Sequence, residues 1–398
     1  MHPIQEQLAK EMGAELSQIL SYWQDFSIDH HYGGFVGERD FNNTLVEKSP
    51  KGIILNSRIL WSFAAAGNFL KTNHFDSICA RAFDYLYTFF RDPEFGGVFW
   101  ELDFRGEKLN ARKQVYAQAF MIYALSAYAK LEKNKKALQW AHEISELIEK
   151  YAYDQRYLGY AEAFSRDWRP VSDMRLSAKD ANEAKTMNTH LHILEAYTAL
   201  YEVAPSGFLK GRLEEIITLF LKKFFDANTN HFQLFFDEKW QAKGDIISYG
   251  HDIEAAWLII EAAKVIDHAE LLSESKKLAL IIAETFAAEG IDRNGGVHYE
   301  YNVRTKELDS DKHWWPQAEA IVGLHYAYEI SQNESYLFLA SKIWRFIKEN
   351  LIDKKNGEWF WSVNGLNEPK VSEYKLGFWK APYHNSRACM KMMHPVIL

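Results

Sequence analysis

Two kinds of apolar pattern alternate along the whole chain. Stretches with apolar residues at helical spacing, such as 75–86 and 258–266, are followed by short segments in which apolar and polar residues alternate, such as 99–106. Helical spacing gives each helix one apolar stripe, whereas strict alternation is typical of a short strand or hairpin. The pattern therefore predicts helices separated by small hairpins.

A recurring turn sets the period of this alternation. Six times an Asp at the end of a helical stretch is followed by a short aromatic turn, which usually contains Gly. These turns are Asp29 with YGGF at 32–35, Asp92 with FGGV at 95–98, Asp154 with YLGY at 157–160, Asp226 with FQLF at 232–235, Asp292 with NGGV at 294–297, and Asp353 with NGEW at 356–359. Counted through Gly34, Gly97, Gly159, Leu234, Gly296 and Glu358, the spacings are 63, 62, 75, 62 and 62 residues. A two-helix unit of this length cannot bury its own apolar faces, so the units must stack.

Six stacked units predict an all-α fold of twelve helices. We expect a closed ring of six helix pairs, an inner set inside an outer set, with short β-hairpins at one end. An open solenoid is the alternative, but the first and last units show no polar capping face. No linker or low-complexity tract interrupts the repeats, so residues 1–398 are expected to form a single domain.

Composition and charge narrow the function. The net charge of -8 argues against nucleic acid as the main partner. Two cysteines, Cys79 and Cys389, are too few for a disulfide scaffold and are expected to be buried apolar residues. The chain has no signal-peptide core and no segment of transmembrane length, so a cytoplasmic location without membrane contact is expected.

The aromatic content points to a sugar ligand. Phe, Trp and Tyr make up 15% of the chain, including 13 Trp. Most of these rings are expected to fill the space between two helix layers. Those that face a cavity would offer flat surfaces to the apolar faces of pyranose rings.

Polar clusters recur at one phase of the repeat, roughly 20 to 30 residues after each turn. They are NSR at 56–58, YAQ at 116–118, NTHLH at 188–192, GHDIE at 250–254, WWPQAE at 314–319 and YHN at 383–385. Pro316 fits the first turn of a helix and Gly250 a turn before one, so the clusters are predicted at helix N-termini. Units related by rotation would bring all six to one mouth of the barrel.

The histidines of these clusters are candidates for proton transfer. Asn188, His192 and Glu195 share one helix face, whereas His190 points elsewhere and is predicted to be structural. His251 and Glu254 are i, i+3 neighbours, a spacing at which a carboxylate holds an imidazole in one tautomer, and this arrangement suits a general base.

A zinc centre on His192, His251 and His384 is the competing interpretation of these histidines. The chain lacks closely spaced ligand pairs such as His-Glu-x-x-His, and a metal needs no Arg58 beside it, so no metal is predicted. The Gly turns precede strands rather than helices, which argues against a nicotinamide cofactor. An Arg and several imidazoles without a cofactor suit proton transfer at a carbon next to a carbonyl, such as C2 of an open-chain aldose.

Five segments resemble the motifs of the cellobiose 2-epimerases, in the N-acylglucosamine 2-epimerase superfamily. They are NSRILW at 56–61, MNTHLHILEAY at 187–197, SYGHDIE at 248–254, WWPQAE at 314–319 and PYHN at 382–385. The resemblance runs from about Trp23 to Arg387. It implies an (α/α)6 barrel, a disaccharide substrate such as cellobiose or lactose, no cofactor, and a monomer or weak homodimer.

The resemblance also implies roles for individual residues. His251 and His384 would be the acid/base pair at C2, His192 would assist ring opening, and Arg58 would hold the enediolate. The substrate-binding residues implied by the resemblance are Tyr116, Asp180, Asn188, Glu254, Trp314 and Trp379. Asp180 lies in the segment 169–183 that lengthens the third repeat, which is expected to form a loop over the mouth.

Other functions stay open from sequence. The superfamily also contains N-acylglucosamine 2-epimerases and aldose–ketose isomerases. An inverting glycoside hydrolase on the same barrel would need two carboxylates that straddle the bond, but histidines dominate these clusters. A sugar-binding protein without catalysis would explain the Trp residues but not an Arg and three His at one phase.

Overall fold

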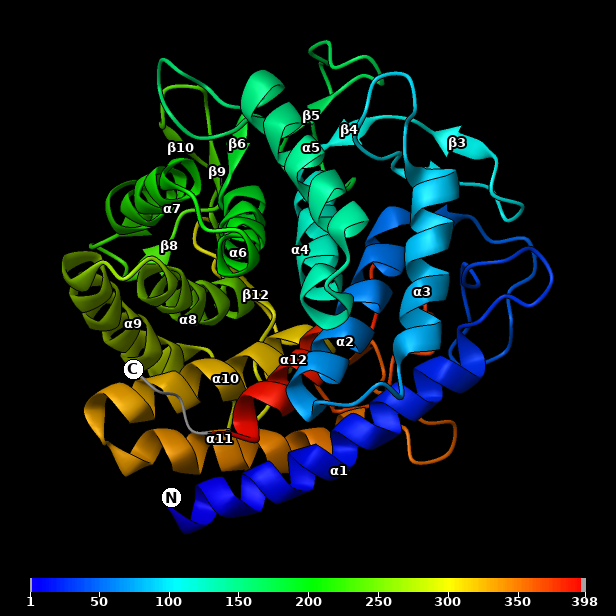
Figure 1. Ribbon diagram of the computed structural model, residues 1–398. Coiled ribbons are helices and arrows are strands. Elements are labelled where there is room, and N and C mark those ends of the chain that lie inside the picture. The colour runs from blue at the N-terminus through cyan, green and yellow to red at the C-terminus, as the bar shows by residue number, and fades with distance from the viewer. Residues whose placement is uncertain (1, 395–398) are drawn as a thin grey trace.

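The computed structural model describes residues 2–394, which fold into two concentric rings of helices (Figure 1). Each inner helix contacts the next, and the last contacts the first, so the ring is closed as predicted. The inner helices are α2 (Ile53–Leu70), α4 (Val115–Glu132), α6 (Met187–Val203), α8 (Tyr249–Val265), α10 (Trp314–Ser331) and α12 (Tyr383–Met392). The outer helices are α1 (Pro3–Phe26), α3 (Asp76–Tyr85), α5 (Lys135–Tyr151), α7 (Gly207–Leu219), α9 (Ala269–Glu289) and α11 (Glu334–Phe346). The all-α (α/α)6 barrel predicted from the repeats is confirmed.

Burial differs between the two rings, as their sequences require. In α2 the run 53–64 is buried without a break, whereas α5 buries one stripe that includes Trp140, Ile144 and Ile148. A helix between two layers is apolar nearly all round, and a helix with one face in water is amphipathic. Three outer helices, α3, α7 and α11, continue into single π-helical turns at η1 (Leu86–Phe90), η2 (Phe220–Phe224) and η3 (Ile347–Leu351).

Small antiparallel sheets join neighbouring repeats at the end where the inner helices begin. The three-stranded sheets are β1 (Lys51–Gly52), β2 (Glu101–Leu102) and β3 (Lys108–Asn110); β10 (Ala242–Lys243), β9 (Phe235–Phe236) and β6 (Lys185–Thr186); and β11 (Ile246–Ser248), β12 (Glu300–Asn302) and β13 (Glu307–Asp309). The two-stranded sheets pair β4 (Lys113–Gln114) with β5 (Ala163–Phe164), β7 (Phe225–Asp226) with β8 (His231–Phe232), and β14 (Lys312–His313) with β15 (Ser362–Val363). In five of these sheets the strand that precedes an inner helix pairs with the hairpin of the next repeat. The hairpins therefore surround one mouth of the barrel.

In five of the six repeats, the Asp of the recurrent turn forms an ion pair with a lysine. The pairs are Asp29 with Lys51, Asp92 with Lys113, Asp154 with Lys185, Asp292 with Lys312 and Asp353 with Lys375, with Nζ to carboxylate distances of 2.5–2.9 Å. The same carboxylates accept backbone N–H groups of their turns, for example from Tyr32. These turns are stabilised because both charges of a mostly buried pair are hydrogen-bonded.

Cys79 and Cys389 are free and buried, as predicted. Within residues 2–394, no helix is both long enough and apolar enough to cross a membrane.

Candidate active site

Not every polar residue at the N-terminus of an inner helix faces the barrel centre. The fourth residue of four inner helices accepts a backbone N–H from the recurrent turn of its own repeat. These bonds run from Val98 to Gln118, from Tyr160 to His190, from Phe232 to Asp252 and from Val297 to Gln317, at 2.7–2.9 Å. His190 is therefore structural, as predicted, and its Nδ1 lies 2.7 Å from the carbonyl of Thr186.

The second and sixth helix positions supply most of the side chains that meet at the centre. From the second position come Tyr116, Asn188, Trp315 and His384, and from the sixth come Arg58, His192, Glu254 and Glu319. His251 is added from the third position of α8. Residues two and six lie one helical turn apart on the same face, so the sixfold arrangement directs them to one place.

Arg58 is a buried cation fixed in one orientation. Its Nη1 donates to the carbonyl of Trp379 and its Nη2 to the hydroxyl of Tyr116, both at 2.9 Å. The guanidinium carbon lies 4.4 Å from the ring centroid of Phe120. Among residues 2–394 no carboxylate lies within ion-pair distance of Arg58, which is only 3% exposed. A buried charge without a counter-ion is costly, so this site favours an anion.

His192 is oriented by Glu195 from the same helix. Its Nδ1 lies 3.1 Å from the Glu195 carboxylate, and its ring meets the Tyr116 ring edge-on at 4.8 Å between centroids. With the carboxylate at Nδ1, Nε2 is left to face a ligand.

His384 is held in the same way by a carboxylate from a different helix. Its Nδ1 lies 2.7 Å from Glu319 and 3.9 Å from Glu254. Burial, and after it the cations Arg58 and Arg387, lower the pKa of His384 well below its usual value. The imidazole is therefore neutral at neutral pH, and its Nε2 is available as a base.

His251 does not have the partner that its spacing predicted. Its Nδ1 lies 2.8 Å from the Ser248 hydroxyl, whereas Glu254 bonds to Arg387, so the predicted His251–Glu254 pair is wrong. The reason is Arg387, a buried cation that attracts the carboxylate more strongly than a neutral imidazole does. Burial, with a smaller effect of His192, lowers the pKa of His251 to about 3.

The Trp315 ring packs against both imidazoles of the candidate acid/base pair. Its centroid lies 4.7 Å from that of His251 and 5.7 Å from that of His384. Gly250 was predicted to form a turn before α8, and this is wrong, because Gly250 is the second residue of that helix. A Cβ at this position would lie 2.5 Å from the Trp315 ring, so glycine is required for this packing.

Beneath the imidazoles lies an ionic layer centred on Arg387, which is 2% exposed. Its Nη2 lies 2.5 Å from Glu254 and 2.7 Å from Glu319, and its Nη1 donates to Glu195 and to the Tyr383 hydroxyl. Burial and then the Glu319 charge raise the pKa of Glu254 to about 7, against the effect of Arg387. One guanidinium thus partners the carboxylates that orient His192 and His384.

The same atoms form the one candidate metal cluster found among residues 2–394. Oxygens of Glu254 and Glu319 and a nitrogen of His384 lie within 4.8 Å of one another. The guanidinium of Arg387 already bridges the two carboxylates, and so supplies the positive charge that a metal would bring. Arg387 therefore occupies the position between these two carboxylates that a metal ion would take.

Dialysis of the protein against EDTA is expected to leave any catalytic turnover unchanged, because Arg387 occupies the position between the two carboxylates. Activity before and after dialysis is the measurement, with a metal assay to verify removal. Loss of activity that added zinc restores would contradict this interpretation.

Several buried polar atoms at this mouth have no hydrogen-bond partner within residues 2–394. They are Oδ1 of Asn188, Nε of Arg58 and Nε1 of Trp314. Such atoms are rare in folded proteins and call for a ligand or water. Their presence beside three imidazoles supports a polar substrate.

The two tryptophans predicted to stack on sugar rings lie in different surroundings. Trp314 is 3% exposed and packs on Trp361 at 4.6 Å between centroids. Trp379 is half-buried in a loop, as predicted, and its ring lies edge-on to Trp100 and to Tyr116. The ring of Trp379 is therefore the more accessible of the two.

Asp180 lies in an irregular segment, as expected from the longer third repeat. Its carboxylate accepts the N–H of Ser177 at 2.7 Å, which shapes the loop itself. Burial, and after it the charges of Asp309 and Asp180, raise the pKa of Glu300 in β12 to about 7.

Sequence reasoning did not select Ser248, Trp315, Glu319 or Arg387 as site residues. Three of them could have been found from the helix register. Trp315 and Glu319 occupy the second and sixth positions of α10, and Ser248 precedes His251 by three residues. Arg387 lies at the fifth position of α12, outside the motif at 383–385, and only its contacts reveal it.

The chain matches the family model of N-acylglucosamine 2-epimerase (GlcNAc 2-epimerase) over residues 33–388. It is 44% identical to a cellobiose 2-epimerase of Bacteroides fragilis, over 98% of this chain and 99% of that protein. It is 37% identical to a cellobiose 2-epimerase of Dictyoglomus turgidum, over 95% of each. The structure of cellobiose 2-epimerase from Bacillus thermoamylovorans superposes with a TM-score of 0.93 at 36% identity, over 98% of this chain and 99% of that one.

Proposed function

The chain belongs to the N-acylglucosamine 2-epimerase family and is a sugar 2-epimerase, and from this premise we propose that it acts on the reducing-end sugar of β-1,4-linked disaccharides such as cellobiose and lactose. The reaction interconverts glucose and mannose at that end. The similarity to cellobiose 2-epimerases over nearly the full length of both chains supports this substrate class.

In the proposed mechanism His384 and His251 exchange protons with the two faces of C2. One neutral imidazole takes the C2 proton of the open-chain aldose, and the C–H electron pair forms the enediolate as the C1 carbonyl becomes an oxyanion. The other imidazole takes up a proton from solvent, delivers it to the opposite face of the enediolate and thereby inverts C2, and the first imidazole releases the C2 proton to solvent. The Ser248 hydroxyl can donate a hydrogen bond to His251 Nδ1 or accept one from it. It can therefore support His251 as the base in one direction of the reaction and as the acid in the other.

The observation that carries this proposal is the unpaired buried charge of Arg58 beside neutral imidazoles. A preorganised guanidinium stabilises an enediolate that carries negative charge only after proton removal. The three carboxylates beneath the imidazoles are not free to flank a glycosidic bond as hydrolysis requires, since Glu195, Glu254 and Glu319 are all bonded to Arg387.

The remaining side chains are assigned to binding. His192, oriented by Glu195, is proposed to assist ring opening between O1 and O5. Tyr116 and Asn188 are proposed to bind sugar hydroxyls, and Glu254 to orient the acid/base site through Arg387 and His384. Trp314, Trp379 and Asp180 are proposed to hold the two sugar rings.

Incubation with cellobiose in deuterium oxide tests the reaction. We expect a glucosyl-mannose disaccharide with deuterium at C2, detected by NMR, because the proton added at C2 comes from an imidazole that exchanges with solvent. An epimer without deuterium at C2 would contradict proton transfer through solvent-exchanged groups. Free glucose would indicate hydrolysis, and a ketose as the sole product would indicate isomerisation.

Trp379→Ala is expected to lower kcat and raise KM on cellobiose. The melting temperature should change little. The half-buried ring is proposed to support the sugar that does not react, and such remote binding energy orients the reacting end. Kinetics and thermal unfolding are measured together, with Trp140→Ala as the control. Trp140 is 2% exposed in α5, and its truncation should cost about 3–5 kcal/mol of stability. A large fall in melting temperature with normal kinetics for Trp379→Ala would show that this ring only packs.

A further inference from the structure

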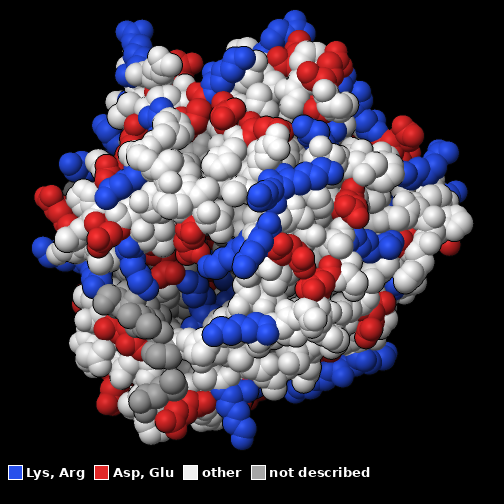
Figure 2. Space-filling model, in the orientation of Figure 1, with Lys and Arg blue, Asp and Glu red and all other residues white. Residues whose placement is uncertain are grey.

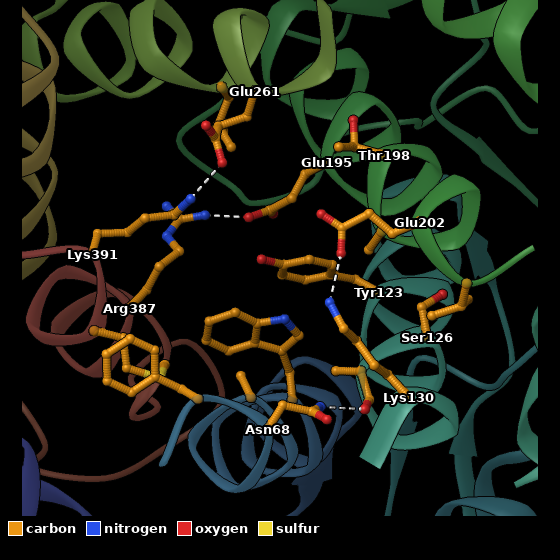
Figure 3. A pocket seen from close by; sticks show the side chains of 18 of the residues that line it. Asn68, Tyr123, Ser126, Lys130, Glu195, Thr198, Glu202, Glu261, Arg387 and Lys391 are labelled. Atoms are coloured by element: carbon orange, nitrogen blue, oxygen red, sulfur yellow. Dashed lines mark hydrogen bonds and ion pairs between the residues drawn. The ribbon is translucent and has the colours of Figure 1, made fainter. Parts of the chain in front are cut away.

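A second cavity opens at the mouth of the barrel opposite the imidazoles. It has a volume of about 540 Å³ and is lined from the C-terminal turns of the inner helices, for example by Asn68 of α2, Lys130 of α4, Glu202 of α6 and Lys391 of α12 (Figure 3). All inner helices begin at the hairpin end, so these turns lie at the other end. The volume is in the range of small-molecule sites.

Aromatic rings form the deep walls of this cavity. Trp61 and Tyr123 stack at 4.9 Å between centroids with an angle of 22° between their planes. Trp257 and Tyr326, which also line the cavity, form a second pair at 5.7 Å between centroids. Flat apolar walls of this kind suit a ligand that contains a ring.

One lysine of the cavity has no ion-pair partner among the described residues. Lys130 pairs with Glu202 at 3.0 Å, Lys391 pairs with Glu261 at 2.6 Å, and Arg387 pairs with Glu195, as Figure 3 shows for the labelled side chains. Lys264 also lines the cavity, and no carboxylate of residues 2–394 lies within ion-pair distance of it. Figure 2 shows the face of the molecule hollowed near its centre, with basic and acidic side chains interspersed around the hollow. The surplus ammonium favours a ligand with one anionic group.

The floor of the cavity is the other side of the ionic layer beneath the active site. Arg387 and Glu195 line the cavity, and Glu195 orients His192. Trp257 also lines it and donates its Nε1–H to Glu319 at 3.2 Å, the carboxylate that holds His384. A ligand here would touch the groups that position two of the three imidazoles.

We propose that this cavity is a second binding site, for a small molecule in which a ring carries one phosphate or carboxylate group, and that its occupancy changes the turnover of the active site. The ring lies against the aromatic walls, and the anionic group lies at the rim beside Lys264. The two sources of this chemistry, a sugar phosphate and an aromatic carboxylate, are separated by the experiment.

Binding of glucose 6-phosphate, 4-hydroxybenzoate and inorganic phosphate to the full chain is measured by calorimetry. One of the ring-bearing anions should bind with a stoichiometry of one, and more tightly than phosphate alone. Ala199→Phe, which fills the cavity from α6, should abolish this binding. Lys264→Gln should weaken it by about two- to fivefold, as expected for an exposed ion pair, and the matched control Lys277→Gln on the outer helix α9 should not.

Kinetics on cellobiose with and without the bound anion test the coupling. The anion should change kcat in the wild type, with no competition against the disaccharide, and should have no effect on Ala199→Phe. If Ala199→Phe fails to fold, Ala127→Phe fills the same cavity from α4. Absence of binding by both ring-bearing anions, binding that survives both filled cavities, equal binding of phosphate, or competition with cellobiose would overturn the site. Binding without any change in kcat would overturn the coupling.

Discussion

His384→Ala is expected to lower kcat on cellobiose by about 10²- to 10⁴-fold while the fold is retained. The imidazole is neutral and buried, and Glu319 holds its Nδ1 at 2.7 Å, so Nε2 is positioned as a base. His251→Ala should cause a loss of similar size, because each imidazole is proposed to act on one face of C2. Turnover and the exchange of the C2 hydrogen in deuterium oxide are measured for both variants.

His190→Ala is the matched control for this pair. His190 is also buried in the N-terminal turn of an inner helix, but it accepts the N–H of Tyr160 and lies close to the Thr186 carbonyl. Its loss should lower the melting temperature and leave kcat of the folded protein nearly unchanged. Near-normal turnover in either His251→Ala or His384→Ala would remove that residue from the mechanism.

Arg387→Met is expected to destabilise the protein by about 3–5 kcal/mol near neutral pH, because it leaves buried carboxylates without their cation. Glu195, Glu254 and Glu319 are each 4% exposed or less, and all three bond to Arg387. Turnover should fall as well, since the same carboxylates orient His192 and His384. Thermal unfolding is the measurement, with Lys130→Met as the control. That variant removes the same charge from an exposed pair and should cost at most about 1 kcal/mol.

The pH dependence of this loss has a definite sign. The pKa of Glu254 is already raised to about 7 with Arg387 present, and the variant should raise it further. A carboxylate whose pKa is higher in the folded than in the unfolded state loses stability as pH rises above its unfolded pKa. The gap in melting temperature between wild type and Arg387→Met should therefore widen from pH 5 to pH 8. A constant gap would show that the cost comes from lost packing rather than from charge.

The ionic layer around Arg387 separates two mouths of one barrel. On one side it orients the imidazoles, and on the other it forms the floor of the second cavity. A change at one mouth can reach the other only through residues that contact both sides of this layer. Glu195 and Trp257 are such residues, since both line the second cavity, Glu195 bonds to His192, and Trp257 bonds to Glu319.

The repeat by itself determined the architecture of this protein. A period near 62 residues requires stacked helix pairs, and six of them close a ring, so the twelve helices and the terminal hairpins followed from sequence. The phase of the polar clusters likewise placed Arg58, His192, His251 and His384 at one mouth. Local spacing succeeds here because neighbouring turns of one helix are fixed by its geometry.

Only the tertiary structure decided which polar group pairs with which. The spacing of His251 and Glu254 predicted a pair, but Arg387 from α12 takes the carboxylate, and Ser248 takes the imidazole. The spacing of His192 and Glu195 is the same, and there the pair forms. In a buried site the strongest available charge sets the partner, and the partner comes from a helix more than 100 residues away in the chain. Helix periodicity carries no information about such contacts.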